Sequence, residues 1–138
     1  MTKRELKAKY RTYTALEAAF RVVYDVLHEL DEALAHGYRM REDLELDLKQ
    51  AGETLAQVRG GLVDDPAGYE LYELLQIAFN RAHEVLRALH IALITGQYVR
   101  ADLADDVQAQ HTALETARPK LIEKMNGYAE LLNGKGGK

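Results

Sequence analysis

Histidines and carboxylates are the side chains of this sequence that are best suited to chemistry. Helical bundles that hold two metal ions use Glu-x-x-His pairs on facing helices, and the comparable spacing here is Asp25-x-x-His28. His83 and His90 lie seven residues apart, but no carboxylates are expected to face them. We therefore predict no metal site and no cofactor, and we assign these histidines to the surface or to the edge of the core.

The sequence has few side chains that could act as a catalytic nucleophile. The sequence contains neither cysteine nor serine, and it has no glycine-rich phosphate loop between a strand and a helix. A histidine in the middle of a helix, as His83 or His90 would be, can carry a phosphoryl group, but the Lys and Gly expected one turn later are missing. We expect a protein that is not an enzyme.

The charge is distributed unevenly along the chain. The net charge is -4, yet residues 1–11 contain five basic side chains against Glu5, and residues 118–138 contain five against Glu123 and Glu130. A basic patch is predicted from Lys3, Arg4, Lys7, Arg11, Lys120 and Lys124. Such a patch could contact phosphates or an acidic partner. The alternative is a solvated face, because no aromatic residues interleave with the basic ones for base stacking.

An internal repeat indicates which elements position these side chains. Residues 10–62 align with residues 69–121 without a gap, and 18 of the 53 aligned positions are identical. In each copy the large apolar residues recur every three or four positions, which is the period of a helix face. Two copies are too few for a solenoid, so we predict that they close on each other as one domain over residues 1–138.

The turns between the predicted helices set their topology. Gly37 and Gly96 follow the last core leucine of a helix by three positions, where a helix C-cap favours glycine. Short turns imply antiparallel neighbours, and the stretch 59–68 would connect the two hairpins. We predict an all-α, up-down-up-down four-helix bundle, with a kink or a break of the fourth helix at Pro119 and a flexible tail at 134–138.

The two predicted turns carry aromatic, Met and Arg side chains, which dominate binding hot spots. The predicted docking residues at these turn tips are Tyr38, Arg39, Met40, Tyr98 and Arg100. The alternative is that they serve the turns alone, with an aspartate in the first turn of the next helix and with Arg41 and Arg100 tying the tips together.

The first helix of the second copy differs from its counterpart on the outer face. It carries a second apolar stripe where the first copy has alanine and glutamate. The stripe consists of Leu74, Ile77, Ala88, Ile91 and Ile94. A helix that is apolar on two faces is normally buried on both, so we predict an interface, most simply that of a twofold homodimer. The alternative is a skewed bundle in which the linker or the carboxy-terminal tail covers the stripe.

These features together favour a non-enzymatic helical interaction module that acts as an adaptor or regulatory subunit. No segment approaches the ~18 uninterrupted apolar residues of a membrane span, and the amino terminus has no apolar stretch typical of a signal peptide. We therefore expect a cytoplasmic protein with no membrane partner. The alternative function is that of an accessory nucleic-acid-binding subunit that uses the basic patch.

Overall fold

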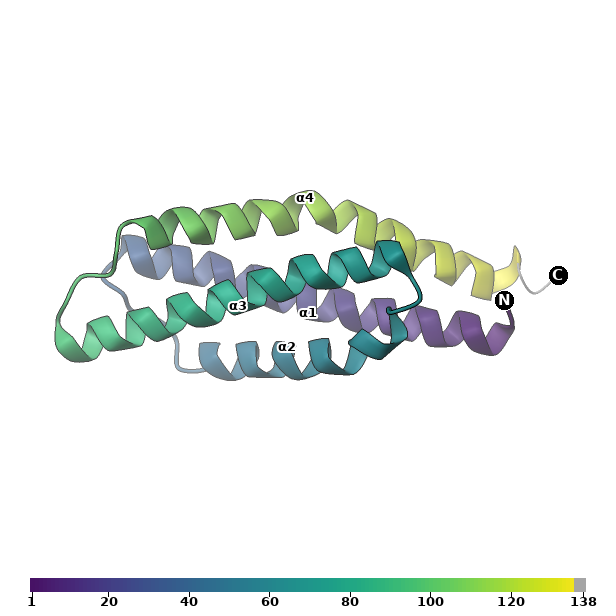
Figure 1. Cartoon of the computed structure of the whole chain (residues 1–138), viewed down its shortest axis with the longest axis horizontal. Helices are drawn as coiled ribbons and strands as arrows, with labels where there is room; N and C mark the ends of the chain where they lie inside the picture. Colours follow the sequence, from purple (N-terminus) through teal and green to yellow (C-terminus); the bar gives the residue numbers. More distant parts are fainter. Residues whose placement is uncertain (136–138) are drawn as a thin grey trace.

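Residues 1–135 are described by the computed structural model, and they fold into four long helices joined by short connections (Figure 1). The helices are α1 (Lys3–Ala35), α2 (Leu44–Val58), α3 (Pro66–Thr95) and α4 (Asp102–Glu130). A 3-10 turn at Arg59–Gly61 follows α2, and a π-helical turn at Leu131–Lys135 follows α4. No strand occurs within this range, so the predicted all-α class with four helices is confirmed. Residues 136–138 of the predicted tail lie outside the described residues.

The two longest helices begin at side chains that satisfy their first backbone N–H groups. The Thr2 hydroxyl accepts a hydrogen bond from the backbone N–H of Glu5 at 3.1 Å, and the Glu5 carboxylate accepts one from the N–H of Thr2 at 3.3 Å. At the start of α3, the Asp65 carboxylate accepts a hydrogen bond from the N–H of Gly68 at 3.2 Å. Pro66 follows Asp65 at the first helical position, where its missing N–H costs nothing.

Glycines in the left-handed conformation lie at both predicted turns. Gly96 ends α3 with φ 72, and its N–H donates to the carbonyl of Ala92. Gly37 has φ 88 and comes one residue after His36, which caps α1. Both glycines take the conformation that the sequence predicts for them, because a Cβ would strain either backbone.

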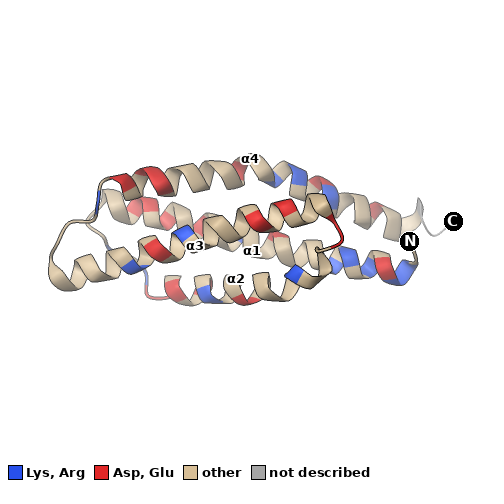
Figure 2. Cartoon of the chain, viewed as in Figure 1, with Lys and Arg blue, Asp and Glu red and all other residues tan. Residues whose placement is uncertain are grey.

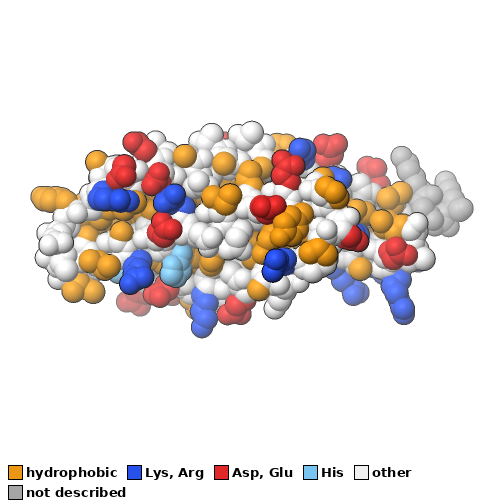
Figure 3. All heavy atoms as spheres, in the orientation of Figure 1, with side chains coloured by type: hydrophobic (Ala, Val, Ile, Leu, Met, Phe, Trp, Pro, Cys, Tyr) orange, Lys and Arg blue, Asp and Glu red, His pale blue; other side chains and the backbone are white. Residues whose placement is uncertain are grey.

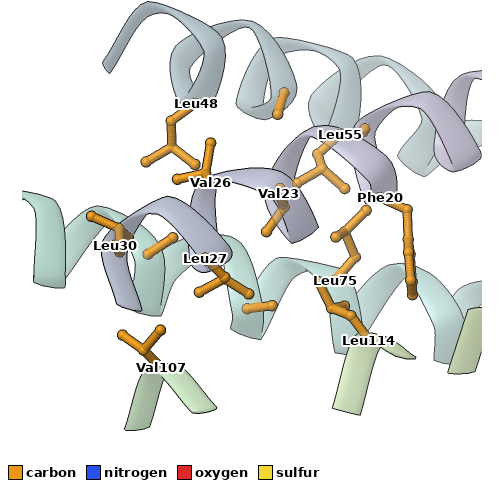
Figure 4. Packing of buried hydrophobic residues seen from close by; sticks show 14 of the residues in the cluster. Phe20, Val23, Val26, Leu27, Leu30, Leu48, Leu55, Leu75, Val107 and Leu114 are labelled. Atoms are coloured by element: carbon orange, nitrogen blue, oxygen red, sulfur yellow. The ribbon is translucent and has the colours of Figure 1, made fainter. Parts of the chain in front are cut away.

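The core is built around α1. This helix makes extensive contacts with each of the other three, whereas α2 and α4 make no comparable contact with each other. Figure 4 shows part of the buried cluster, in which Phe20 and Leu27 of α1 lie among leucines and valines contributed by α2, α3 and α4. The contact between α1 and α3 means that the four helices pack as a skewed group with α1 near its centre.

The helices differ in length, and this leaves one end of α3 uncovered. α2 has 15 residues, about half the length of α3 with its 30. In Figure 1 the carboxy-terminal end of α3 extends past the ends of the other three helices, at the end of the molecule opposite to both termini. Leu93 is therefore half exposed, although its spacing places it on the apolar seam of the helix.

α4 continues through Pro119 as a single helix. The sequence left open a kink or a break at this residue, and the structure has one helix there instead of two. Proline lacks the N–H that would donate to the carbonyl of Glu115, so the helix continues without that one hydrogen bond. Pro119 is exposed, which places the missing bond at the surface.

Candidate interaction surface

The predicted apolar stripe lies along the outer side of α3. The exposed fractions are 58% for Ile77, 49% for Ile91 and 84% for Ile94. Leu74 and Ala88 are half buried at the edge of the core. Figure 3 shows hydrophobic side chains at the end of the molecule to which α3 projects and elsewhere along the same face. The described residues of the linker and of the segment after α4 leave these isoleucines exposed, so the alternative of a covered stripe is wrong for residues 1–135.

Hollows border this stripe where α3 meets α4 or the turn that leads to it, and two of them lie beside its isoleucines. One has a volume of about 410 Å³ and is lined by Leu74 and Ile77 of α3 and by Gln110 and Ala113 of α4. The other has a volume of about 310 Å³ and lies at the opposite end of the stripe. Its walls include Ala88, Ile91, Tyr98, Val99 and Leu103. Interfaces pack with high shape complementarity, and a surface with exposed isoleucines next to hollows can provide both the protruding and the receiving parts.

The middle of the stripe is polar. The Arg81 guanidinium donates to the Glu84 carboxylate at 2.9 Å, and it lies 3.7 Å from the carboxylate of Asp106 on α4. Arg81 is about one third exposed and Glu84 is mostly exposed. The outer face of α3 therefore has two apolar segments separated by a charged pair of opposite sign.

The turn tips are joined by Tyr38 and not by the two arginines. The Tyr38 hydroxyl accepts a hydrogen bond from the backbone N–H of Val99 at 3.1 Å, which ties the first turn to the second. Arg41 instead donates to Glu29 and Asp47 at 2.6 Å each, and these hydrogen bonds raise its pKa. Arg100 lies 3.5 Å from the carboxylate of Asp102 in its own turn. The alternative in which Arg41 and Arg100 tie the tips together is therefore wrong.

The predicted docking residues at the tips divide into two groups. Tyr38 and Met40 are half buried against the core, and Tyr38 has a left-handed backbone with φ 67. Arg39, Tyr98 and Arg100 are exposed, and Tyr98 is 92% exposed. Only the second group is available to a partner, and Tyr98 lies beside the hollow at the projecting end of α3.

The predicted basic residues lie at the end of the molecule that holds both termini. Figure 2 shows the Lys and Arg positions of α1 near the N-terminus, in blue, and those of α4 in the same half of the molecule. Lys3, Arg4, Lys7 and Arg11 are exposed, as is Lys120, whereas Lys124 is half buried. Glu5, Glu123 and Glu130 are exposed in the same two segments, so the charge at this end of the molecule is mixed.

The linker before α3 is fastened to α1 by a network that the sequence analysis missed. The Lys9 ammonium donates to the Asp64 carboxylate and to the Gly61 carbonyl, both at 2.9 Å. The Tyr13 hydroxyl donates to the Asp65 carboxylate at 2.5 Å, and its ring lies 5.5 Å from that of Tyr128. The Asp-Pro pair at residues 65 and 66 is a helix-start signal, but nothing in the pattern pairs it with Tyr13.

The network shifts the pKa values of its members in opposite directions. Burial, followed by the hydrogen bond to Asp65, raises the pKa of Tyr13. For Asp65, burial raises the pKa, but the hydrogen bonds from Tyr13 and Gly68, with the nearby charge of Lys9, outweigh burial and lower the pKa. The hydrogen bond from Lys9 lowers the pKa of Asp64. The linker is thus held by ionised carboxylates and a neutral tyrosine.

His111 is a second feature that the sequence analysis overlooked. Its ring stacks on that of Tyr24 at 4.1 Å and lies 6.1 Å from that of His28, and its Nε2 atom is buried without a hydrogen-bond partner. The repeat could have drawn attention to His111, because this residue aligns with Gly52, so the two copies differ at this position. His83 and His90 are exposed. Among residues 1–135, no three His, Cys, Asp or Glu side chains are grouped as metal ligands would be.

A hollow of about 720 Å³ lies between α1 and α4, and no pattern in the sequence predicts it. Its apolar walls include Phe20, Tyr24, Pro119 and Ile122. Arg21 and Arg118 line it together with Asp25, Glu115 and Glu123, so neither sign of charge dominates.

Comparison with protein-family models, with curated proteins and with solved structures found no match to this chain. Within the described part of the chain, none of the helices has the length and apolar character that crossing a membrane requires.

Proposed function

We propose that the protein is a non-enzymatic helical interaction module, an adaptor or regulatory subunit, which forms a homodimer through the outer face of α3. The observation that carries this proposal is the exposure of Ile77 and Ile91 on a helix whose opposite face packs into the core along most of its length. Burying the exposed half of one isoleucine contributes about 1 kcal/mol, and a twofold interface would bury four such side chains.

The proposal includes the architecture that the repeat implies, an up-down-up-down bundle made of two copies of one hairpin, with a kink in α4 at Pro119. Burial at aligned positions supports it. Leu16 and Leu75 are both completely buried, and Leu30 and Leu89 are as well. In such a bundle the residues common to both copies serve the core. The apolar residues of the α3 stripe, which the first copy lacks, are then free to serve an interface.

The experiment is to replace Ile77 and Ile91 together with aspartate and to measure the molar mass by light scattering. We expect a dimer for the unchanged protein and a folded monomer for the variant, because four buried carboxylates would make the dimer interface unfavourable. The matched control replaces Leu46 of α2 and Val63 of the linker with aspartate. These residues are 53% and 66% exposed and lie off α3, so the control is expected to stay dimeric. An unchanged mass for the Ile77→Asp, Ile91→Asp variant would remove the proposal.

Nucleic-acid binding is a second candidate, and the exposure of Lys3, Arg4 and Lys7 on α1 favours it, since the basic segments of α1 and α4 lie in the same half of the molecule. It predicts binding to single- or double-stranded nucleic acid that weakens as salt rises, because bound cations release counterions from the phosphates. Charge reversal of these three residues would abolish the binding, whereas Lys49→Glu on α2 would leave it unchanged. Absence of retention at low salt would exclude this candidate.

A further inference from the structure

The outer face of α3 has a symmetric order of residue types. The successive positions on this face, at spacings of three, four, three, four and three residues, are Leu74, Ile77, Arg81, Glu84, Ala88 and Ile91. Alternating spacings of three and four keep side chains on one face of a helix and are typical of paired helices. From either end the order is two apolar residues and one charged residue, and the two charged residues at the centre have opposite signs. The face is therefore complementary to itself when the helix direction is reversed.

We propose that α3 pairs with α3 of a second copy in the antiparallel direction, about a twofold axis that passes between residues 82 and 83. This register rests on the proposed dimerisation through the same face. Leu74 then meets the partner's Ile91, and Ile77 meets the partner's Ala88. The large side chain of Ile77 faces the small one of Ala88, so these positions interlock without crowding.

The charged pair selects the antiparallel direction. Arg81 and Glu84 already bond to each other within one chain, at 2.9 Å, and Glu84 keeps most of its side chain exposed. In the antiparallel register each Arg81 meets the partner's Glu84, so the two pairs form one four-membered cluster of alternating charge. A parallel pairing would instead bring each Arg81 against the partner's Arg81, and like charges at that distance repel.

The hollows along the stripe fit the same register. The twofold axis exchanges the two ends of the face, so the hollow of about 410 Å³ beside Leu74 and Ile77 receives the partner's Ile91. The hollow of about 310 Å³ beside Ala88 and Ile91 receives the partner's Ile77 and Leu74. The positions with exposed isoleucines therefore meet positions where the surface is hollowed.

The test uses charge reversal in two single variants and their mixture. In Glu84→Arg, positions 81 and 84 are both basic, and in Arg81→Glu both are acidic, so each variant alone places like charges across the axis. We expect each to self-associate about tenfold more weakly than the unchanged protein, because two opposed pairs change in each dimer. An equimolar mixture restores opposite charges at every contact, and we expect a heterodimer about as tight as the unchanged homodimer, measured by sedimentation with one variant labelled.

The controls separate this register from the dimer itself. Lys49→Glu and Glu53→Arg reverse two exposed charges on α2 and are expected to leave association unchanged, alone or mixed. Recovery on mixing supports the register, and thermal unfolding of each variant checks that it remains folded. If the single variants associate like the unchanged protein while Ile77→Asp with Ile91→Asp does not, the register is wrong and the α3 interface stands. Weakening without recovery on mixing overturns the antiparallel register, and a monomeric unchanged protein overturns both proposals.

Discussion

α1 and α3 occupy aligned positions in the two halves of the sequence, but their outer faces have opposite character. In α1 the position of Ile91 is held by Glu32, which lies 3.5 Å from the His36 ring nitrogen, and the position of Ala88 is held by Glu29, which accepts hydrogen bonds from Arg41. Both helices bury the opposite face in one core. The core therefore does not need an apolar residue at these outer positions, since α1 manages without one, and the outer stripe of α3 requires a different explanation.

The largest losses of stability are expected from substitutions at core positions where α1 and α3 carry the same residue. Leu16 and Leu75 are aligned and completely buried, so Leu16→Ala and Leu75→Ala should each lower the free energy of unfolding by about 3 kcal/mol, through lost transfer energy and a cavity. Ile77→Ala, two residues from Leu75 but on the exposed face, should cost less than about 1 kcal/mol in the monomer. Urea unfolding measures all three. Two separate transitions, or a much smaller loss for one leucine, would show that the halves do not share one core.

A smaller effect is expected where aligned residues differ in their partners. The Tyr13 hydroxyl donates to the ionised Asp65 at 2.5 Å, whereas that of the aligned Tyr72 lies 3.4 Å from the Gln76 side-chain oxygen. Tyr13→Phe should cost about 1.5 kcal/mol, because it removes a partly buried hydrogen bond to a charge, and Tyr72→Phe less than about 0.5 kcal/mol. Thermal unfolding of the two variants side by side provides the measurement. Equal losses would mean that the Asp65 contact adds nothing to stability.

Part of the fold could be predicted from the sequence. The spacing of the apolar residues predicts the buried face of each helix, and the left-handed conformations of Gly37 and Gly96 follow from the absence of a Cβ in glycine. Spacing is local information, so it gives the direction in which a side chain points and not how far one helix extends past another. Leu93 is half exposed for that reason.

The residues of the candidate surface could also be predicted from spacing, because the positions of Ile77 and Ile91 along α3 place them off the core face. Contacts between distant segments were not predictable. The bond from the Val99 N–H to Tyr38 joins residues 61 apart, and the bond from Tyr13 to Asp65 joins residues 52 apart. Each depends on where a connection comes to lie after the helices have packed, which no local pattern encodes.

The smallest expected effect is a pH dependence that one carboxylate of the linker confers. The pKa of Asp65 is lowered from its ordinary value of 3.8, because hydrogen bonds and nearby positive charge outweigh burial. A lowered pKa in the folded state means that the unfolded chain takes up a proton first as the pH falls. The stabilisation is therefore present above the ordinary pKa and is lost progressively as the pH falls through the folded value.

Asp65→Asn should flatten this part of the acid limb, since the amide no longer titrates. Its single oxygen can still accept from the Gly68 N–H, while its NH2 group can donate to the Tyr13 hydroxyl. Urea midpoints between about pH 6 and about pH 2 measure the slope for both proteins. Asp25→Asn, an exposed aspartate of α1, is the matched control and should leave the slope unchanged. If the slope of Asp65→Asn equals that of the unchanged protein, the linker carboxylate does not distinguish the folded state from the unfolded one. The fastening of the linker to α1 would then depend on Lys9 and its bonds to Asp64 and the Gly61 carbonyl.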